Sequence, residues 1–439
     1  MAIGRRILFV ENRYRTYFWE EMANRLEKDG HEIYFIVENH AFVPKRKNVY
    51  VIPYPVRKNL NEINSRIEFE KIKCSDRAIN YFELTSSNHY EYYYEQIKAY
   101  IIKIKPDIVF GESTAFHELL TIEICKGDNI LYLHPSSCRY PVGRFSFYKY
   151  DTLEPYGGSE EVLSEMNAME IVNNIVRRAI VPDYMKKKKV KFSTRYARLK
   201  ELIKLTLAYY GGERYDTPSP IVKYFLEKRK KQNILRWNEL ANNQLKKIEL
   251  SVFKILYPLQ MQPEANLDVW GRKCNNQLQV IKNIIQETDE RIYLVVKPNP
   301  KSKYELSSEL IDYIQQEERI IVVHHDVRMN EIFPKVDMVI TVTGTITMEC
   351  IWANKPVVTL VRTLYNDVAN AIFLEKFNDL QLCIDMVRKN EFPCIDDKQK
   401  VAFLNRITRT SFAGMPYEIN MDENNLEQCK IAFEKVLQV

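Results

Sequence analysis

Threonine and glycine residues gather where a buried apolar run passes directly into a helical pattern. The run ends at Thr343-Gly344-Thr345, and Thr347 and Glu349 follow in the first turns of the expected helix. The hydroxyls and free N–H groups of a helix start bind anions, and glycine lets a phosphate approach the backbone closely. Glu349 is then placed to accept hydrogen bonds from ribose hydroxyls. The alternative is a capped helix with an ordinary first-turn acid.

Polar residues also lie at the ends of other expected strands in the C-terminal half. A stiff loop with two prolines and two lysines follows the strand at 291–298, which suits a phosphate or carboxylate. Amides follow the strand at 253–258, where they can form hydrogen bonds with a base or with sugar hydroxyls. In each case a plain strand-to-helix loop is the alternative. The predicted nucleotide-binding residues of these loops are Gln260, Gln262, Glu264, Lys297, Asn299, Lys301 and His324.

A second set of charged residues lies in the N-terminal half. His134, Arg139 and Arg144 follow the expected strand at 130–134, and Asp151 comes soon after. Two arginines can hold a substrate carboxylate while a neighbouring acid does chemistry. We predict that the arginines lower the pKa of Asp151 and keep it ionised, as a nucleophile requires. Glu112, at the end of the strand at 107–111, then serves proton transfer.

Several common sites are excluded by their missing motifs. The sequence holds no G-x-G-x-x-G, no P-loop, no H-E-x-x-H and no G-x-S-x-G. Eight cysteines show no C-x-x-C spacing, which excludes a zinc ribbon and suits a reducing compartment. His324 and His325 are adjacent on a strand and point to opposite faces, so they cannot both bind one ion. We therefore expect no metal and no cofactor.

The elements that position these residues alternate between strand and helix. Short apolar runs at 6–10, 31–37, 49–54, 107–111 and 130–134 are separated by helical patterns. The same alternation returns at 253–258, 291–298, 319–324, 338–342 and 356–360. This pattern predicts two α/β lobes with parallel sheets, in which ligands bind beyond the carboxyl ends of the strands. We expect the site in the cleft between the lobes.

The length of 439 residues and the hydrophobic content of 46% fit a globular chain of several domains. We predict a first α/β lobe at 1–158, a helical insert at 159–245, a second α/β lobe at 246–410 and a C-terminal helical tail at 411–439. No apolar run reaches the roughly 18 residues of a membrane-spanning helix. The net charge is only +6, with basic clusters at Lys186–Lys191 and Lys228–Lys231. These are solvated helix faces or a surface for anionic membrane.

The C-terminal motifs resemble the nucleotide-sugar lobe of GT-B glycosyltransferases. The resemblance rests on the Lys297-Pro298-Asn299-Pro300 turn, Thr343-Gly344-Thr345, Glu349 and Lys355-Pro356. Pro258-Leu259-Gln260 narrows it to bacterial capsule-polysaccharide transferases, including retaining transferases of Kdo and related ulosonic acids. The stretch from Arg139 through Asp151 to Gly157 resembles their N-lobes. The resemblance therefore implies that the lobe at 1–158 is the acceptor side and that the lobe at 246–410 binds the nucleotide sugar. Family members often have His-Pro at 299–300, and serine at 343 or 345.

This resemblance implies a cytosolic enzyme that moves an acidic sugar from a CMP donor onto a surface polysaccharide or glycolipid. The implied partners are the donor, a glycan or lipid-linked acceptor and the inner face of the cytoplasmic membrane, with no nucleic acid. Helix N-termini and cations offset the leaving phosphate in place of a metal. A UDP-sugar transferase, a UDP-sugar 2-epimerase and a non-catalytic glycan-binding protein of the capsule machinery remain alternatives.

Overall fold

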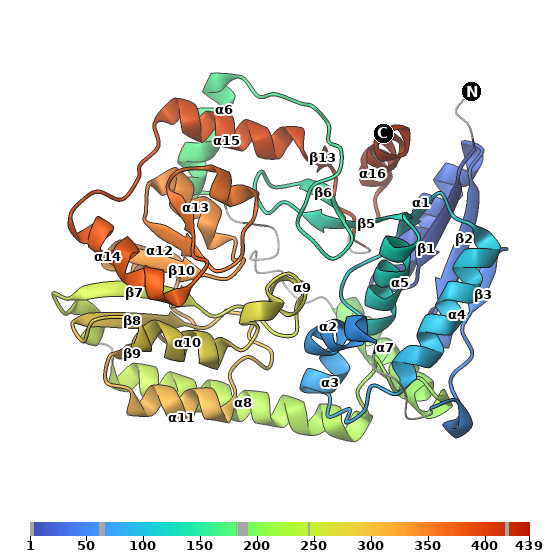
Figure 1. Cartoon of the computed structure of the whole chain (residues 1–439), viewed down its shortest axis with the longest axis horizontal. Helices are drawn as coiled ribbons and strands as arrows, with labels where there is room; N and C mark the ends of the chain where they lie inside the picture. Colours follow the sequence, from blue (N-terminus) through green and yellow to red (C-terminus); the bar gives the residue numbers. More distant parts are fainter. Residues whose placement is uncertain (1–3, 61–65, 181, 183–191, 245, 418–420) are drawn as a thin grey trace. The chain divides into compact units, whose positions relative to one another are not determined.

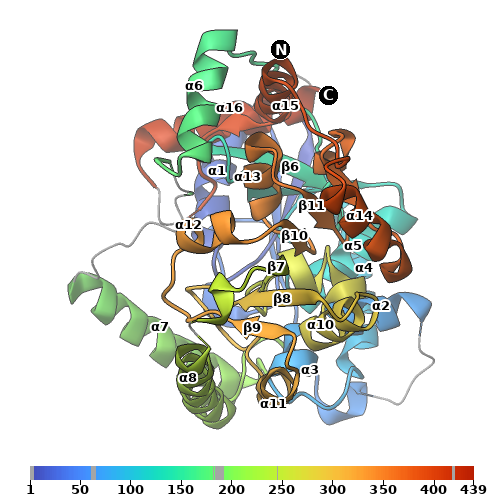
Figure 2. The same ribbon diagram turned by 90° about the vertical axis from the view of Figure 1, so that its left-hand side faces the viewer.

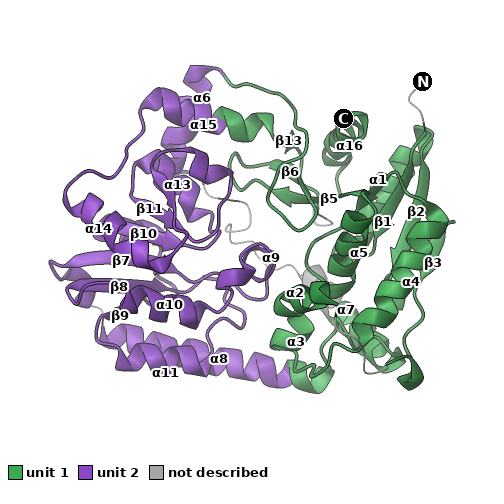
Figure 3. Cartoon of the chain, viewed as in Figure 1, with its two compact units in different colours: residues 1–163, 181–223, 405–439 green, residues 164–180, 224–404 purple. Residues whose placement is uncertain are grey.

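The chain folds into two compact α/β units (Figure 3). The computed structural model describes residues 4–60, 66–180, 182, 192–244, 246–417 and 421–439. Unit 1 comprises residues 1–163, 181–223 and 405–439, and unit 2 comprises residues 164–180 and 224–404. Each unit is built around its own sheet.

The sheet of unit 1 has the strand order β13-β6-β5-β4-β1-β2-β3. The strands β3, β2, β1, β4 and β5 are parallel to one another, which is the order of a dinucleotide-type α/β fold. The strands are β1 (Arg6–Val10), β2 (Glu32–Val37), β3 (Val49–Val51), β4 (Ile108–Phe110), β5 (Leu131–Ser137), β6 (Arg144–Lys149) and β13 (Phe412–Ala413). The chain order reverses between β1 and β4, and such a reversal opens a ligand crevice at the carboxyl ends.

The described helices of unit 1 pack against this sheet, against one another or against its loops. They are α1 (Thr16–Lys28), α2 (Ile67–Ser75), α3 (Arg77–Tyr81), α4 (His89–Ile104), α5 (Phe116–Gly127), α7 (Phe192–Gly211) and α16 (Glu423–Gln438). The C-terminal helix α16 packs against α1, as Figure 1 shows, and Phe433 meets Trp19 and Phe9 in one buried cluster. The predicted tail at 411–439 is therefore part of the core of unit 1.

Two strands of unit 1 run antiparallel and were not predicted. The β6 strand pairs with β5 and with β13, and Phe145 and Phe147 place their rings in the core. Residues 135–151 were expected to form a loop that leaves the sheet. The hairpin reverses the chain direction, so the end of β6 lies beside the beginning of β5.

The sheet of unit 2 has the order β12-β11-β10-β7-β8-β9, with all strands parallel. This is the Rossmann order, with its reversal between β7 and β10. The strands are β7 (Phe253–Pro258), β8 (Ile292–Lys297), β9 (Ile320–Val322), β10 (Met338–Thr341), β11 (Val357–Thr359) and β12 (Ala371–Phe373). The predicted α/β class with two Rossmann-like lobes is confirmed.

The remaining helices are α6 (Glu165–Val176), α8 (Pro220–Asn243), α9 (Ala265–Asp268), α10 (Gln277–Gln286), α11 (Ser308–Gln316), α12 (Met329–Ile332), α13 (Ile346–Ala353), α14 (Leu380–Arg388) and α15 (Asp397–Arg409). The α8 and α11 helices lie side by side in both views (Figures 1 and 2), joined by a 2.7 Å ion pair between Arg236 and Asp312. The Trp237 indole of α8 donates to the Val323 carbonyl at 2.9 Å, which fixes α8 to the unit 2 sheet.

The segment 159–245 contains α6, α7 and α8 and no described strand, as its sequence predicts. It does not form a unit of its own, because its residues are divided between units 1 and 2. The unit boundaries therefore differ from the predicted boundaries at 158, 245 and 410. In the part of the chain that the structure describes, no helix has the length and apolar character needed to cross a membrane.

Candidate functional site

The carboxyl edge of the unit 2 sheet brings several predicted nucleotide-binding residues together. Gln260 follows β7 and Thr343 follows β10, on either side of the strand-order reversal. The Gln260 amide donates to the Thr343 hydroxyl at 3.3 Å, and that hydroxyl donates to the Asn266 carbonyl at 2.7 Å. The Gln260 Oε1 atom is buried and has no hydrogen-bond partner among the described residues. A hydrogen-bond acceptor is thus available at the switch point, the place where the strand order reverses and where such sheets bind ligands.

Gly344 is required here by the packing of the protein itself. Its N–H donates to the Thr341 hydroxyl at 3.2 Å. A Cβ atom at position 344 would clash with that hydroxyl and lie 3.4 Å from the Gln260 amide nitrogen. The tight turn therefore explains the glycine without a phosphate.

Lys297 places a cation at the same edge. It ends β8 in register with Pro258 of β7, and only 3% of its surface is exposed. Its ammonium donates to the Pro298 carbonyl at 3.1 Å and forms no ion pair with a described residue. Burial lowers the pKa of Lys297 to about 8, although the charges of Asp326 and Glu331 act in the opposite direction. The ammonium is therefore charged at neutral pH but poorly compensated.

The first turn of α13 contributes less than predicted. Thr345 precedes the helix, and Thr347 is fully buried with a hydroxyl that has no partner among the described residues. Glu349 forms an ion pair with Arg178, which follows α6. The predicted ribose contact of Glu349 therefore competes with this pair.

Other predicted donor residues are used by the loops themselves. The buried Gln262 amide donates to Asp268 and to the Asn275 carbonyl, both at 2.8 Å. Glu264 precedes α9, and its N–H donates to Asp268 at 2.8 Å. These contacts give Gln262 and Glu264 a role in shaping the loop after β7.

Two loops beyond β8 and β9 hold the remaining donor residues. The Asn299 side chain accepts from the Lys301 N–H at 2.8 Å and so closes a turn, while Lys301 is exposed. The His324 Nδ1 accepts from the Asp326 N–H at 3.2 Å. Asn299 and His324 thus stabilise their own loops.

Glu112 lies at the carboxyl edge of the unit 1 sheet, as predicted. Its carboxylate pairs with Arg15 of the segment that leads into α1. Burial raises the pKa of Glu112 to about 7, while Arg15 acts to lower it. A carboxyl group with this pKa gains and loses a proton near neutral pH, which suits a general base.

Asp151 lies far from Glu112. Its carboxylate pairs with Lys71 at 2.8 Å and with Lys126 at 2.6 Å, and Lys126 is in the last turn of α5. The Glu112 N–H instead donates to Glu118 in the first turn of α5, at 3.1 Å. Two residues at opposite ends of this helix are separated by about 12 Å of helix rise. The two predicted catalytic carboxylates therefore do not share one site.

The predicted cations around Asp151 are also different. The Arg144 guanidinium donates to the hydroxyls of Ser411 and Ser159 at 2.9 and 2.8 Å and to Glu161 at 2.6 Å. Arg144 thus ties β6 to the last segment of unit 1. Arg139 has a left-handed backbone with φ of 66° and is half-buried in the turn before β6. Lys71 and Lys126 are described ion-pair partners of Asp151.

His134 is unsuited to holding a substrate carboxylate as a cation. It is buried within β5, where its Nε2 lies 3.1 Å from the Thr152 carbonyl. Burial lowers its pKa to about 4, so the imidazole is neutral at physiological pH.

Sequence analysis missed a denser polar network at the switch point of unit 1. Glutamates directly follow three neighbouring parallel strands: Glu11 follows β1, Glu38 follows β2, and Glu112 comes just beyond β4. Burial raises the pKa of Glu11 to about 7 and the pKa of Glu38 well above its ordinary value. The repeated placement of an acid after an apolar run was the available signal.

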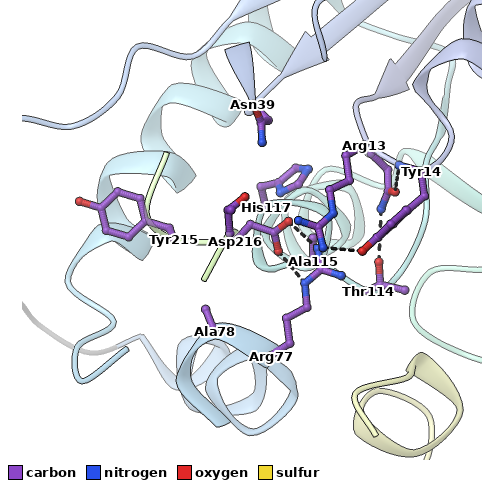
Figure 4. A network of polar contacts seen from close by, with 12 residues as sticks. Arg13, Tyr14, Asn39, Arg77, Ala78, Thr114, Ala115, His117, Tyr215 and Asp216 are labelled. Atoms are coloured by element: carbon purple, nitrogen blue, oxygen red, sulfur yellow. Dashed lines mark hydrogen bonds and ion pairs between the residues drawn. The ribbon is translucent and has the colours of Figure 1, made fainter. Parts of the chain in front are cut away.

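Residues distant in sequence complete this network (Figure 4). Asn12 donates to Thr114 at 3.3 Å and to Glu118 at 3.0 Å, and so joins the loops after β1 and β4. Arg77 and Asp216 form an ion pair beside them, and His117 of α5 lies close by. The described residues contain no cluster of His, Cys, Asp or Glu that is arranged to hold a metal ion.

Residues 168–368 match the family described as "Capsule polysaccharide biosynthesis protein". The matched range is somewhat less than half of the chain. The family predicted from the sequence is thereby confirmed, and it indicates a glycosyltransferase. The matched range runs from α6 to the loop after β11 and includes every predicted donor residue.

Solved structures share the general architecture at low sequence identity. The Thermosulfurimonas dismutans KpsC β-Kdo 2,7-transferase is 13% identical, with 85% of this chain and 97% of that chain covered at a TM-score of 0.34. UDP-GlcNAc 2-epimerase from Methanocaldococcus jannaschii is 12% identical, with 93% and 99% covered at a TM-score of 0.30. Likenesses at these TM-scores do not identify an activity. No curated protein matches the chain.

Proposed function

We propose that this capsule-family protein transfers an acidic sugar, Kdo or another ulosonic acid, from a CMP donor to a surface polysaccharide or glycolipid. Unit 2 binds the donor and unit 1 binds the acceptor. The bond between the acceptor oxygen and the anomeric carbon forms as the bond from that carbon to the CMP phosphate breaks. CMP leaves with the electron pair, and the acceptor hydroxyl loses its proton.

The observation that carries the proposal is the buried Lys297 ammonium at the switch-point edge of unit 2. A buried cation without a carboxylate partner raises the energy of the free protein, and an anionic ligand relieves that cost. Gln260, in the loop after β7, and Thr347, in the first turn of α13, add buried oxygens that have no hydrogen-bond partner among the described residues. A compact site with one buried cation suits the single phosphate of CMP, as the sequence resemblance implies.

Glu112 is the residue that we propose as the proton acceptor. It lies at the carboxyl edge of unit 1 and has a pKa of about 7. Arg15 stabilises the ionised form, so the carboxylate is available at neutral pH. Asp151, which is bound by two lysines at the other end of α5, is assigned a structural role.

The predicted membrane contact belongs to the proposal as well. Lys186–Lys191 lie outside the described residues, whereas in Lys228–Lys231 all but Lys230 are exposed on α8, and Lys230 pairs with Glu227. Helix α7 also exposes Leu199, Leu202, Ile203, Leu207 and Tyr210, which share one helical face. Apolar and basic side chains on exposed helices fit a peripheral contact with anionic lipid. Co-sedimentation with phosphatidylglycerol vesicles, but not with phosphatidylcholine vesicles, tests this contact.

Nucleotide binding by Lys297→Met tests the donor site. Methionine fills a similar volume without the charge, so the fold is retained and CMP affinity falls at least tenfold. Lys355→Met is the control, because Lys355 is a half-buried lysine that, like Lys297, donates to a carbonyl, that of Val336. Lys355 precedes β11 and lies at the amino edge of the sheet, away from the proposed site.

Calorimetric titration with CMP, UMP and UDP measures these affinities. We expect CMP to bind most tightly, and we expect its affinity to fall in Lys297→Met but not in Lys355→Met. Preference for UDP would favour a UDP-sugar transferase or epimerase. Equal CMP affinity in wild type and Lys297→Met would place the donor elsewhere.

A further inference from the structure

Arg13 carries a guanidinium that the protein leaves largely unpaired. Its one described hydrogen bond goes to the hydroxyl of Tyr14, and its carbon lies 4.6 Å from the centre of that ring. The Arg13 Nε is buried and has no partner among the described residues. A guanidinium has five N–H donors, so most of its hydrogen-bonding capacity is open.

A second arginine lies beside it, and the two share one acid. Arg77 binds the Asp216 carboxylate through two nitrogens, one of them at 2.8 Å. Figure 4 shows Arg13 and Arg77 approaching Asp216 from two sides. Burial would raise the pKa of Asp216, but Arg77 and Arg13 lower it to about 2, so this carboxylate is ionised between two cations.

The other acids nearby are engaged by backbone groups or are only partly ionised. Glu118 accepts from the N–H groups of residues 112, 114 and 115, and Glu213 accepts from those of residues 215, 216 and 217. Burial raises the pKa of Glu11 to about 7, so Glu11 is only partly ionised near neutral pH, and burial also raises the pKa of Glu213.

The same two arginines affect the ionisation of the Tyr14 hydroxyl. Burial would raise its pKa, but Arg13 and Arg77 outweigh that effect and lower it. Although its hydroxyl lies among these groups, 51% of Tyr14 is exposed, so the network reaches the surface of unit 1 at this residue.

His117 adds a hydrogen-bond acceptor to the same place. Its Nε2 lies 2.8 Å from the Glu11 carbonyl and donates to it, so in the neutral imidazole Nδ1 is the hydrogen-bond acceptor. That nitrogen is buried and has no partner among the described residues. Figure 4 places the imidazole between Asn39 and Asp216, on the side toward which Arg13 points.

We propose that Arg13, supported by Arg77, binds an oxyanion of the acceptor at the switch point of unit 1. The oxyanion is the carboxylate of an acidic sugar or the phosphate of a lipid carrier. His117 Nδ1 accepts a hydrogen bond from a hydroxyl of the same molecule. The inference rests on the proposed function for the identity of the ligand, but the anion site itself does not depend on CMP.

Calorimetric titration of the full chain with free Kdo and with glycerol 3-phosphate tests the site, with saturating CMP present to occupy the donor loops. Arg13→Gln is expected to weaken binding at least tenfold, and Arg13→Lys to weaken it less because the charge remains. Arg25→Gln is the matched control, since Arg25 of α1 is engaged by Glu423 and Glu427. Circular dichroism verifies that each variant is folded.

Binding of Kdo alone assigns the site to a sugar carboxylate, and binding of glycerol 3-phosphate alone assigns it to a lipid-linked phosphate. The inference is overturned if neither probe binds, if Arg13→Gln binds like wild type, or if Arg25→Gln loses affinity equally. A chain that binds Kdo through Arg13 but does not bind CMP would keep this site and refute the proposed donor.

Discussion

The Glu112 carboxylate lies against the Arg15 guanidinium, so the acid that follows β4 is held by the segment that follows β1. The ion pair spans the point where the strand order of unit 1 reverses. Burial opposes ionisation of Glu112 and Arg15 favours it, and the balance leaves a pKa of about 7. The position of the acid in the fold thus accounts for its proton affinity.

The pH dependence of transfer follows from this pKa. A general base must be ionised, so kcat/KM should fall about tenfold per pH unit below about 7. Glu112→Gln should lower kcat at least tenfold and remove this acidic limb. Initial rates with a defined acceptor between pH 5.5 and 8.5 provide the measurement.

Glu11→Gln is the control for that profile, because burial raises the pKa of Glu11 to a similar value. If the fall in kcat/KM at low pH disappears in Glu11→Gln and remains in Glu112→Gln, the proton acceptor is Glu11.

Asp151→Asn should affect the fold more than the chemistry. The substitution weakens the contacts to Lys71 and Lys126, and the expected loss of unfolding free energy is about 1–3 kcal/mol. Turnover per folded molecule should stay within about threefold of wild type, since Asp151 lies at the far end of α5 from Glu112. Urea unfolding and steady-state rates measure the two effects. Loss of turnover with unchanged stability would instead support the role of Asp151 as the nucleophile that was predicted from the sequence.

The central strands and their helices could be predicted from the sequence because each is a short apolar run or an amphipathic pattern. The β6 strand could not be, because its register depends on pairing with β5 and with β13, which comes more than 260 residues later in the chain. That one hairpin decides where Asp151 lies. The expectation that Asp151 and Glu112 act together failed for this reason.

Site residues at strand ends were easier to predict than their partners. Gln260, Lys297 and Thr343 meet at one edge because parallel strands align their carboxyl ends. The pairing of Arg77 with Asp216 depends on how the chain returns to unit 1 after residue 181, and no local pattern encodes it. The acids at the ends of β1, β2 and β4 were predictable in type and place, but their raised pKa values depend on burial.

Stability should depend on pH through Glu11. Its pKa in the folded chain is about 7, above the ordinary 4.5, so the folded state holds the proton more tightly than the unfolded state. Its contribution is therefore present below about pH 4.5 and is lost as the pH rises to about 7. The Glu11→Gln variant cannot ionise at this position and should be more stable than wild type at pH 8. Between pH 5 and pH 8, the difference in unfolding free energy should shift in favour of the variant by about 1–3 kcal/mol. Urea unfolding at both pH values measures this change. A difference that does not vary with pH would contradict the shift.

Gly344→Ala separates the two explanations for the glycine in the donor loop. If glycine served only the approach of a phosphate, the free protein would tolerate alanine and CMP affinity alone would fall. The structure predicts otherwise, because the new Cβ would clash with the Thr341 hydroxyl inside the turn. Overpacking of this kind costs about 1–3 kcal/mol of unfolding free energy.

Gly127→Ala is the matched control for this substitution, since a Cβ there has no neighbour within 4 Å. At the end of α5 the added methyl should be neutral or stabilise the fold by up to about 1 kcal/mol. Thermal unfolding without nucleotide should therefore show a lower Tm for Gly344→Ala only. An unchanged Tm in Gly344→Ala would show that the turn can relax and that the glycine is needed by the ligand.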